Sequence, residues 1–170
     1  MALLEILHYP DLRLRTQAQT VTDFDADLQK IIDDMYETMY KARGAGLAAT
    51  QVNIHLRLAV MDVVDSGQQP ICMINPEVVF SSGTQIDQHG CLSLPGVPGD
   101  NLKRAAKVTL RALDRFGKPF ELEAEKTLAI CIQHEIDHLN GKLYIDHLSN
   151  LKRERLFKKA EKHNRRTQDE

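Results

Sequence analysis

The five residues from His134 to His138 (His-Glu-Ile-Asp-His) constrain this chain more than any other segment. The two histidines are four residues apart, so in a helix both imidazoles lie on one face and reach the same metal ion. Glu135 points to the side, close enough to handle the proton of a water molecule at that metal. The apolar residues that give the segment a buried face are Leu128, Ile132 and Leu139. The pattern therefore predicts a half-buried, metal-binding helix from about residue 125 to residue 140, ending at Gly141.

Two histidines leave a catalytic metal short of a third protein ligand. The extended metzincin pattern would need a histidine at the position of Tyr144, and His147 comes three residues late. Cys131 is one turn before His134, but its short side chain leans towards the helix N-terminus, which is more typical of a core or pocket-wall residue. Cys91 is flanked by glycine and proline, where backbone approaches an ion closely. Cys91 is the better candidate, although the residues alone leave both cysteines open.

A third segment, Gly44–Gln51 (GAGLAATQ), is rich in glycine and alanine. Small residues allow the chain to lie close to a substrate backbone, and Gln51 adds an amide donor. A helix stop followed by tight packing is an equally good interpretation. The segment is neither a P-loop nor a dinucleotide fingerprint, because it lacks the residues that define those motifs.

The remaining periodicity favours the α+β class, because strands and helices are grouped and do not alternate. A helix follows Asp25 and stops near Gly44, and strands are expected over residues 56–64 and 71–80. Two further strands, 107–113 and 120–124, form a hairpin, and Ser149 caps a charged third helix. We expect mixed antiparallel sheets packed around the central helix that carries the HExxH motif, with a C-terminal helix at the end of the chain.

The 170 residues fit one domain, with residues 1–150 as the catalytic body and 151–170 as a basic C-terminal helix and tail of the same domain. Residues 151–166 contain eight Lys and Arg and two Glu, whereas the preceding body is acidic. A basic tail on an acidic body is typical of a protein with a polyanionic partner, and a solvated surface helix explains it equally well.

Three sparse cysteines do not form a disulfide framework, and Cys72 is expected to be a plain core residue. No apolar run approaches the length of about 20 residues that a membrane span needs. The opening residues have no basic leader. We therefore expect a soluble protein of a reducing compartment, the cytoplasm.

Together the three segments resemble the peptide deformylase family. The family's first motif looks like Gly44–Gln51, its second like Gly90–Ser93 (GCLS) and its third like Gln133–His138 (QHEIDH), in the same order and at similar separations. The resemblance runs from about residue 3 to residue 160 and is typical of the bacterial type.

The resemblance implies one divalent metal held by Cys91, His134 and His138. This is ferrous iron in many members, and zinc, nickel or cobalt can occupy the site. Glu135 would act as general base and then as the acid that protonates the leaving amine. Gln51, through its side-chain amide, and Leu92, through its backbone N–H, would stabilise the oxyanion.

The implied reaction is hydrolysis of the N-formyl group from the initiating methionine of a new chain, with release of formate. Gly46 would hydrogen-bond the peptide backbone, and Ile130, Cys131 and His134 would line the methionine pocket. The basic helix would dock on the ribosome near the tunnel exit. We expect a monomer that binds neither DNA nor a membrane.

One departure concerns His89, which precedes Gly-Cys-Leu-Ser where the family usually carries Glu. An Arg that some relatives carry shortly after the motif is also missing from residues 96–101. His89 either competes for metal and shifts the acidity of the site, or lies partly exposed beside the loop. The alternatives to a deformylase are a catalytically silent protein of the ribosome with a structural metal, and another HExxH metallopeptidase.

Overall fold

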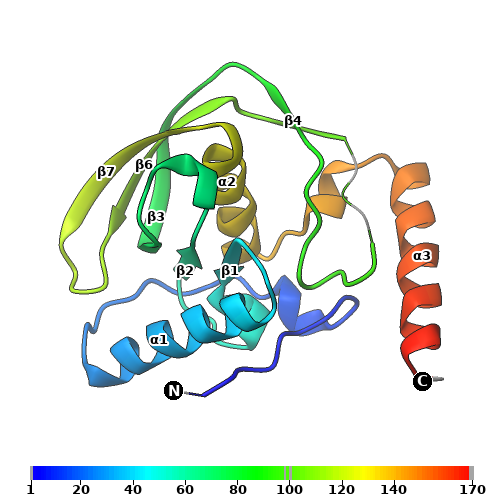
Figure 1. Ribbon diagram of the computed structural model, residues 1–170, viewed down its shortest axis with the longest axis horizontal. Helices are drawn as coiled ribbons and strands as arrows, with labels where there is room; N and C mark the ends of the chain where they lie inside the picture. The colour runs from blue at the N-terminus through cyan, green and yellow to red at the C-terminus, as the bar shows by residue number, and fades with distance from the viewer. Residues whose placement is uncertain (1, 98, 100, 169–170) are drawn as a thin grey trace.

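The computed structural model describes residues 2–97, 99 and 101–168. Helix α2 lies in the middle of the molecule, the long strands curve over it, and α3 stands at one edge (Figure 1). The helices are α1 (Ala26–Lys41), α2 (Lys126–Leu139) and α3 (Asn150–Gln168). The strands are β1 (Gly46–Ala48), β2 (Leu58–Met61), β3 (Ile71–Ser82), β4 (Gln85–Asp87), β5 (Leu102–Arg104), β6 (Lys107–Leu113) and β7 (Pro119–Glu125). Four 3-10 turns complete the fold: η1 (Leu12–Arg15), η2 (Ala49–Val52), η3 (Val64–Ser66) and η4 (Tyr144–His147).

The strands form two antiparallel sheets, which confirms the expected α+β class. The larger sheet has the order β1-β2-β3-β6-β7, and β4 pairs only with β5 in a separate two-stranded sheet. The predicted hairpin joins β6 to β7, and Gly117 takes a φ of 84° in its turn. The predicted strand 56–64 is shorter, because only Leu58–Met61 pairs with its neighbours. The sequence patterns did not predict β1, β4 or β5, since three residues are too few for a period-two signal.

Strand β2 explains where the core sits, because all four of its residues are fully buried. Leu58 and Val60 face α1, and Ala59 and Met61 face α2. The sheet therefore lies between the two helices at this end. A strand that is covered on both faces reads as a continuous apolar run, as this one does.

Helix α1 begins where the sequence predicts and ends slightly earlier than expected. The Asp25 carboxylate caps it by accepting a hydrogen bond from Leu28 N at 2.9 Å. The helix ends at Lys41, and Arg43, with φ 58°, takes the left-handed conformation that we expected at Gly44. The stop is thus one residue before the glycine, and Gly44 N still bonds to Met39 O.

Helix α2 has the predicted bounds within one residue at its start, and Gly141 terminates it. Gly141 has a φ of 73°, and a Cβ there would lie 2.4 Å from Arg15 O. Only glycine fits that position, because a side chain would be strained and would collide with backbone. The end of the helix that carries the two histidines is therefore fixed against the N-terminal segment.

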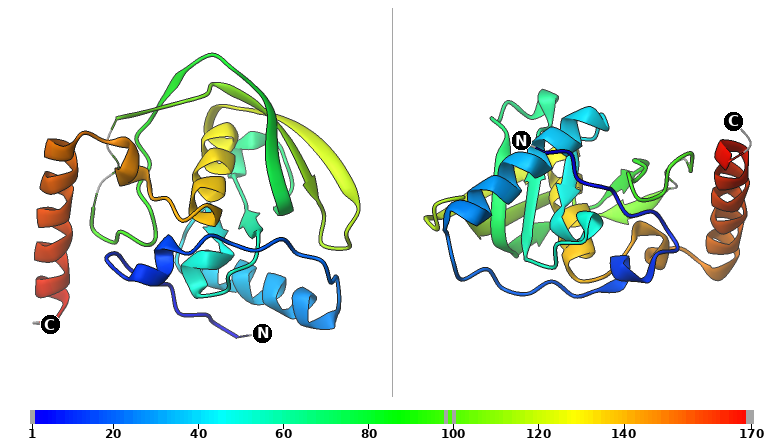
Figure 2. Two further views of the ribbon diagram at one scale, coloured as in Figure 1. Left: turned by 180° about the vertical axis from the view of Figure 1, so that it is seen from behind. Right: turned by 90° about the horizontal axis from the view of Figure 1, so that it is seen from below.

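Helix α3 stands alongside one edge of the molecule (Figure 2). Ser149 Oγ accepts a hydrogen bond from Lys152 N, as the predicted cap requires. Leu156 is buried in a third apolar cluster, and Phe157 stacks on Tyr9 with ring centroids 4.7 Å apart. None of the helices in the described ranges is long and apolar enough to cross a membrane.

Candidate metal centre and active site

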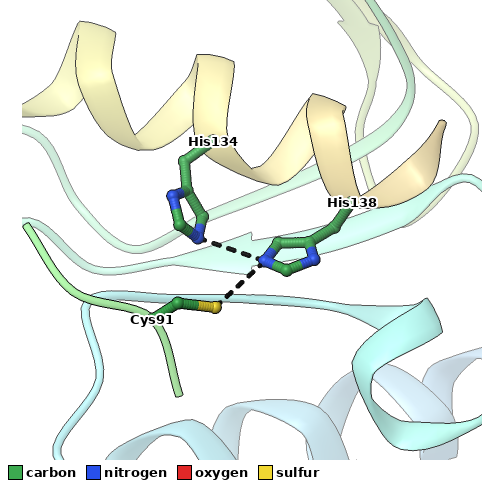
Figure 3. Close-up of side chains that lie close together, drawn as sticks. All are labelled: Cys91, His134 and His138. Carbon is green, nitrogen blue, oxygen red and sulfur yellow. Dashed lines mark hydrogen bonds between the residues drawn. The ribbon is translucent and has the colours of Figure 1, made fainter. Parts of the chain in front are cut away.

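Three side chains from two distant segments meet beside α2 (Figure 3). His134 and His138 project from one face of the helix, and their Nε2 atoms are 3.1 Å apart. Cys91 approaches from the loop that follows β4, with its Sγ 3.3 Å from His138 Nε2. The three ligand atoms lie within 4.8 Å of one another. This is the cluster that the sequence motifs imply.

The chemistry of these three donors fits a divalent metal. Burial lowers the pKa of His134 to about 4 and that of His138 well below its usual value, so both imidazoles are neutral and keep a lone pair. Burial raises the pKa of the Cys91 thiol to about 12 in the protein alone. A thiolate ligand forms when a cation displaces that proton. One sulfur and two nitrogens suit iron(II), zinc, nickel or cobalt better than magnesium or calcium.

Glu135 is the buried acid of this site, with only 3% of its surface exposed. Its Oε2 atom has no hydrogen-bond partner among the described residues. Burial raises the pKa of its carboxyl to about 8, against a smaller opposing effect of Arg104. An unpaired carboxyl with a pKa near neutrality can both accept and return a proton under physiological conditions.

Gln51 is held with its amide nitrogen towards the cluster. Its Oε1 accepts a hydrogen bond from Ala48 N at 2.9 Å, which turns Nε2 towards Ser93 Oγ at 3.1 Å and Cys91 Sγ at 3.8 Å. The side chain is 1% exposed. Leu92 follows Cys91 directly and lines the same cavity.

A cavity of about 500 Å³ opens beside the cluster. It is lined by the Cys91 loop and by the candidate site residues Gly46, Gln51, Leu92, Ile130, Cys131, His134 and Glu135. Cys131 lies in its wall with Sγ 3.8 Å from Ala45 O and is not part of the three-ligand cluster. A larger groove of about 610 Å³ lies beyond Thr127, and none of the three ligand residues lines it.

Gly46, the first residue of β1, packs against side chains of α2. A Cβ at this position would be 2.8 Å from both Cys131 Sγ and Glu135 Oε1. Any larger residue at this position would therefore displace the carboxyl of Glu135 or the thiol of Cys131. The Gly- and Ala-rich segment is a strand followed by a 3-10 turn, packed against α2, which confirms the tight packing. The substrate-binding interpretation of the segment stays a prediction.

His89 lies outside the ligand cluster. Its side chain is 58% exposed, and its Nδ1 lies 3.1 Å from Asp87 Oδ1. This matches the interpretation of a partly exposed histidine beside the loop. Cys72 is half-buried in β3 and is less enclosed than the core position that we expected, and all three cysteines are free thiols.

The sequence reasoning missed Ser93. Its side chain is fully buried, its Oγ accepts the hydrogen bond from Gln51, and its backbone N–H points to Cys91 Sγ at 3.4 Å. Ser93 therefore links two of the motifs. The signal was its place in Gly-Cys-Leu-Ser, where a small hydroxyl residue follows the proposed ligand at a distance of two residues.

A Cys-His-His cluster with an open side and a buried carboxyl next to it defines a metal-dependent hydrolase. Comparison with known proteins agrees with that class. The model of the polypeptide deformylase family matches residues 3–154. The chain therefore belongs to the peptide deformylase family, and the family is an enzyme family that acts in protein biosynthesis.

Similar proteins match over nearly their whole length. Peptide deformylase 1 of Shewanella oneidensis is 55% identical over 95% of this chain and 96% of its own. A crystal structure of a peptide deformylase from Legionella pneumophila has a TM-score of 0.94 and 51% identity, with 99% of each chain covered. A deformylase from Ehrlichia chaffeensis, solved in complex with actinonin, has a TM-score of 0.91 and 39% identity, with 97% of this chain and 99% of that one covered.

Proposed function

We propose that this chain hydrolyses the N-formyl group from the initiating methionine of nascent polypeptides and releases formate. The observation that supports this most directly is the cluster of Cys91, His134 and His138 beside the unpaired carboxyl of Glu135. Membership of the deformylase family supports the same reaction and disfavours both a general HExxH peptidase and a silent protein with a structural metal.

Cys91, His134 and His138 would hold one divalent metal, which we propose to be ferrous iron in the cell. When bound, such a metal polarises the formyl carbonyl and lowers the pKa of coordinated water towards ~7. The protein supplies three ligands and leaves one side of the cluster facing the cavity. A structural site would be closed by a fourth protein ligand.

Glu135 would move the protons of the reaction. Its carboxylate takes a proton from the attacking water and then donates that proton to the leaving amine nitrogen of methionine. A pKa raised to about 8 by burial supports this double use, because both the carboxylate and the protonated form are then populated near neutral pH.

Two donors would stabilise the negative charge that develops on the formyl oxygen. Gln51 would donate from Nε2, whose direction is set by the hydrogen bond from Ala48 N to its Oε1. Leu92 would donate from its backbone N–H. A donor of this kind typically contributes a factor of about 10²–10³ to the rate.

The wall of the cavity would bind the substrate, through Gly46, Ile130, Cys131 and His134. The support for this is their position along the wall of the same cavity as the ligand cluster. Gly46 would bond the peptide backbone from β1, which is an edge strand of the larger sheet. Ile130 and Cys131 would contact the methionine side chain.

Residues 151–170 would form a docking element of the same domain, of which residues 169 and 170 lie outside the described structure. The side chains of Lys158, Lys159, Lys162 and Arg165 are exposed on α3, which supports an electrostatic contact with ribosomal RNA near the tunnel exit. We further propose a monomer that acts in the cytoplasm.

The test is formate release from formyl-Met-Ala-Ser by protein purified without air, together with elemental analysis. We expect about one equivalent of metal, and loss of formate release in Glu135→Ala, which lacks the proton carrier. Bound metal without formate from the parent protein would contradict the proposal and favour the silent, ribosome-associated alternative.

A further inference from the structure

The small sheet of β4 and β5 carries the chain into Cys91, yet it shares no strand pairing with the larger sheet. Cys91 must nevertheless keep its Sγ a few ångströms from two imidazoles on α2. After Cys91 the loop is held by Leu94 and Val97, which are buried in the third apolar cluster. Before Cys91, the contact with α2 is made by polar side chains.

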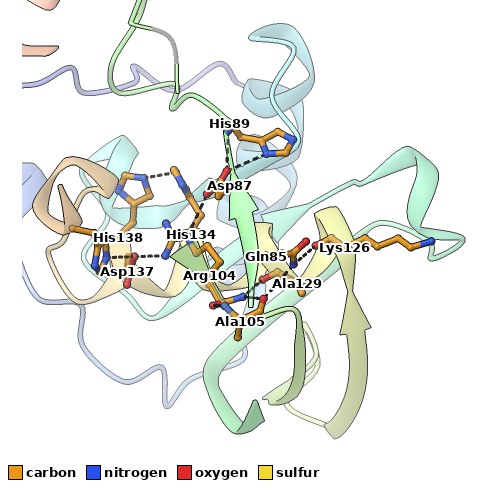
Figure 4. A network of polar contacts seen from close by, with 12 residues as sticks. Gln85, Asp87, His89, Arg104, Ala105, Lys126, Ala129, His134, Asp137 and His138 are labelled. Atoms are coloured by element: carbon orange, nitrogen blue, oxygen red, sulfur yellow. Dashed lines mark hydrogen bonds and ion pairs between the residues drawn. The ribbon is translucent and has the colours of Figure 1, made fainter. Parts of the chain in front are cut away.

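Arg104, the last residue of β5, is at the centre of that contact (Figure 4). Its Nε is 3.3 Å from Asp87 Oδ2 on β4, and its Nη1 is 2.7 Å from Asp137 Oδ2 on α2. Asp137 lies directly before His138, and Asp87 lies four residues before Cys91. One guanidinium thus joins the segment of the sulfur ligand to the helix of the nitrogen ligands.

The network is deeply buried, with side-chain exposures of 5% for Arg104, 2% for Asp87 and 19% for Asp137. Buried ion pairs contribute little net stability compared with apolar residues of the same volume, but they impose a specific geometry. The planar guanidinium holds two carboxylates at defined angles, which a point charge cannot do. We therefore expect this network to affect the position of Cys91 more than the overall stability of the fold.

We propose that Arg104 is a positioning residue of the metal site: through Asp87 and Asp137 it holds the Cys91 segment at ligand distance from His134 and His138. Within the described ranges, the side-chain partners of Arg104 are Asp87 and Asp137, and Arg104 is not among the residues that line the cavity. Gln133 adds a second tie between α2 and the residue that follows β5, since its side chain bonds both Ala105 N and Ala105 O, at 3.0 and 3.1 Å. A further contact reaches β4 directly, because Gln85 Nε2 donates to Lys126 O, at the start of α2, at 3.1 Å. The Arg104 contact differs from both, since it joins Asp87 on β4 to Asp137, the residue next to the ligand candidate His138.

The inference rests on the proposed ligand set and is tested by metal retention, which needs no formyl peptide. The protein is loaded with Co²⁺, whose absorption reports thiolate ligation, and a chelator is added to measure the rate of metal loss. Loss of a residue that orients metal ligands typically costs about 10–100-fold in metal affinity. We expect Arg104→Met to lose Co²⁺ about 10–100 times faster than the parent, with an altered thiolate band at temperatures where the variant is folded.

Arg111→Met is the matched control, because Arg111 forms an exposed pair with Glu121 at 3.0 Å on β6 and β7. We expect parent-like metal loss from that variant. Arg104→Lys keeps the positive charge but lacks the planar guanidinium, so it should recover only part of the Co²⁺ retention. With formyl-Met-Ala-Ser, Arg104→Met should lower kcat while KM changes little, since Arg104 does not line the cavity.

If Arg104→Met does not fold, Asp87→Asn tests the proposal instead. This substitution keeps the shape of the side chain on β4 and removes only the charge that pairs with Arg104. A folded variant of either kind with parent-like Co²⁺ loss and absorption would overturn the proposal. A parent protein without any thiolate band would overturn the ligand set itself. Normal metal retention with no deformylase activity would instead contradict the proposed function and leave the positioning result intact.

Discussion

At the scale of single residues, the site depends on the missing side chain of Gly46 as well as on the side chains that line it. Gly46 leaves room for the carboxyl of Glu135 and the thiol of Cys131. His89 shows the converse case, a titratable side chain next to the site that takes no part in the cluster. Both positions permit predictions at the level of one substitution.

Gly46→Ala should reduce kcat/KM by up to about 100-fold, since the added methyl group displaces the carboxyl of Glu135 and a misplacement of about 1 Å can cost a factor of that size. The added methyl group lies 2.8 Å from Glu135 Oε1 and Cys131 Sγ, so one of them must move. Steady-state kinetics with formyl-Met-Ala-Ser measures the effect. Removing the thiol in Gly46→Ala/Cys131→Ala should restore part of it, and unchanged kinetics in the single variant would contradict the packing argument.

His89→Glu should retain the metal content of the parent and stay within about twofold of its turnover. The physical reason is that 58% of the His89 side chain is exposed, so the new carboxylate can turn into solvent, away from Asp87, and Asp87 keeps its ion pair with Arg104. Elemental analysis and formate release provide the measurement. Loss of metal, or a large change of turnover in either direction, would show that His89 acts on the site after all.

At the scale of elements, α3 divides into an attached part and an extended part. Its first turns contribute Leu156 to the third apolar cluster and Phe157 to the stack on Tyr9, and Arg153 bonds the carbonyl oxygens of η4. The later turns carry exposed basic side chains. The position of a truncation therefore decides whether it tests docking or stability.

Truncation after Asn150 should lower the melting temperature by at least about 4 °C, because it exposes the surface that Leu156 and Phe157 cover, and burial of one such side chain contributes about 1.5–3 kcal/mol. Truncation after Lys158 keeps both residues and should leave the melting temperature unchanged. Calorimetry compares the two proteins.

Only the truncation after Lys158, which removes fewer residues, therefore tests docking without changing stability. We expect the protein truncated after Lys158 to bind ribosomes more weakly and to hydrolyse a soluble formyl-Met peptide at the parent rate. Cosedimentation with ribosomes measures the first effect. Equal ribosome affinity of the truncated and full-length proteins would argue against the docking role of α3.

At the scale of the whole molecule, the metal site adds a link between two parts that otherwise meet through polar side-chain contacts such as those of Arg104. Cys91 comes from the loop between the two strands of the small sheet, whereas His134 and His138 come from the helix against the large one. A metal that binds all three therefore cross-links the two halves of the fold. Ligands that bind only the folded state raise its stability by mass action.

Removal of the metal should lower the melting temperature, and the loss should grow with the metal concentration used in the reference sample. At a metal concentration 100 times its Kd, the stabilisation is about 2.7 kcal/mol, which corresponds to roughly 5–10 °C for a chain of this size. Calorimetry with and without chelator, followed by readdition of Co²⁺ or Zn²⁺, measures it. A melting temperature that is independent of metal would contradict the cross-link.

The sequence by itself determined the features that depend on short-range pattern. The two histidines at helical spacing, the cap at Asp25, the hairpin around Gly117 and the stop at Gly141 all lie where local chemistry predicts them. These elements follow from backbone geometry and periodicity, which a window of a few residues contains.

The residues alone left both Cys91 and Cys131 open as the third member of the cluster. Only the tertiary structure shows Cys91 beside the two histidines, because its loop reaches α2 through long-range packing. The same holds for β1 and for the pair of β4 and β5, whose three-residue strands are stabilised by their partners and not by their own pattern. Arg104 belongs to this second group as well. Its carboxylate partners are 17 and 33 residues away in the chain, so its role exists only once the fold has brought three segments together.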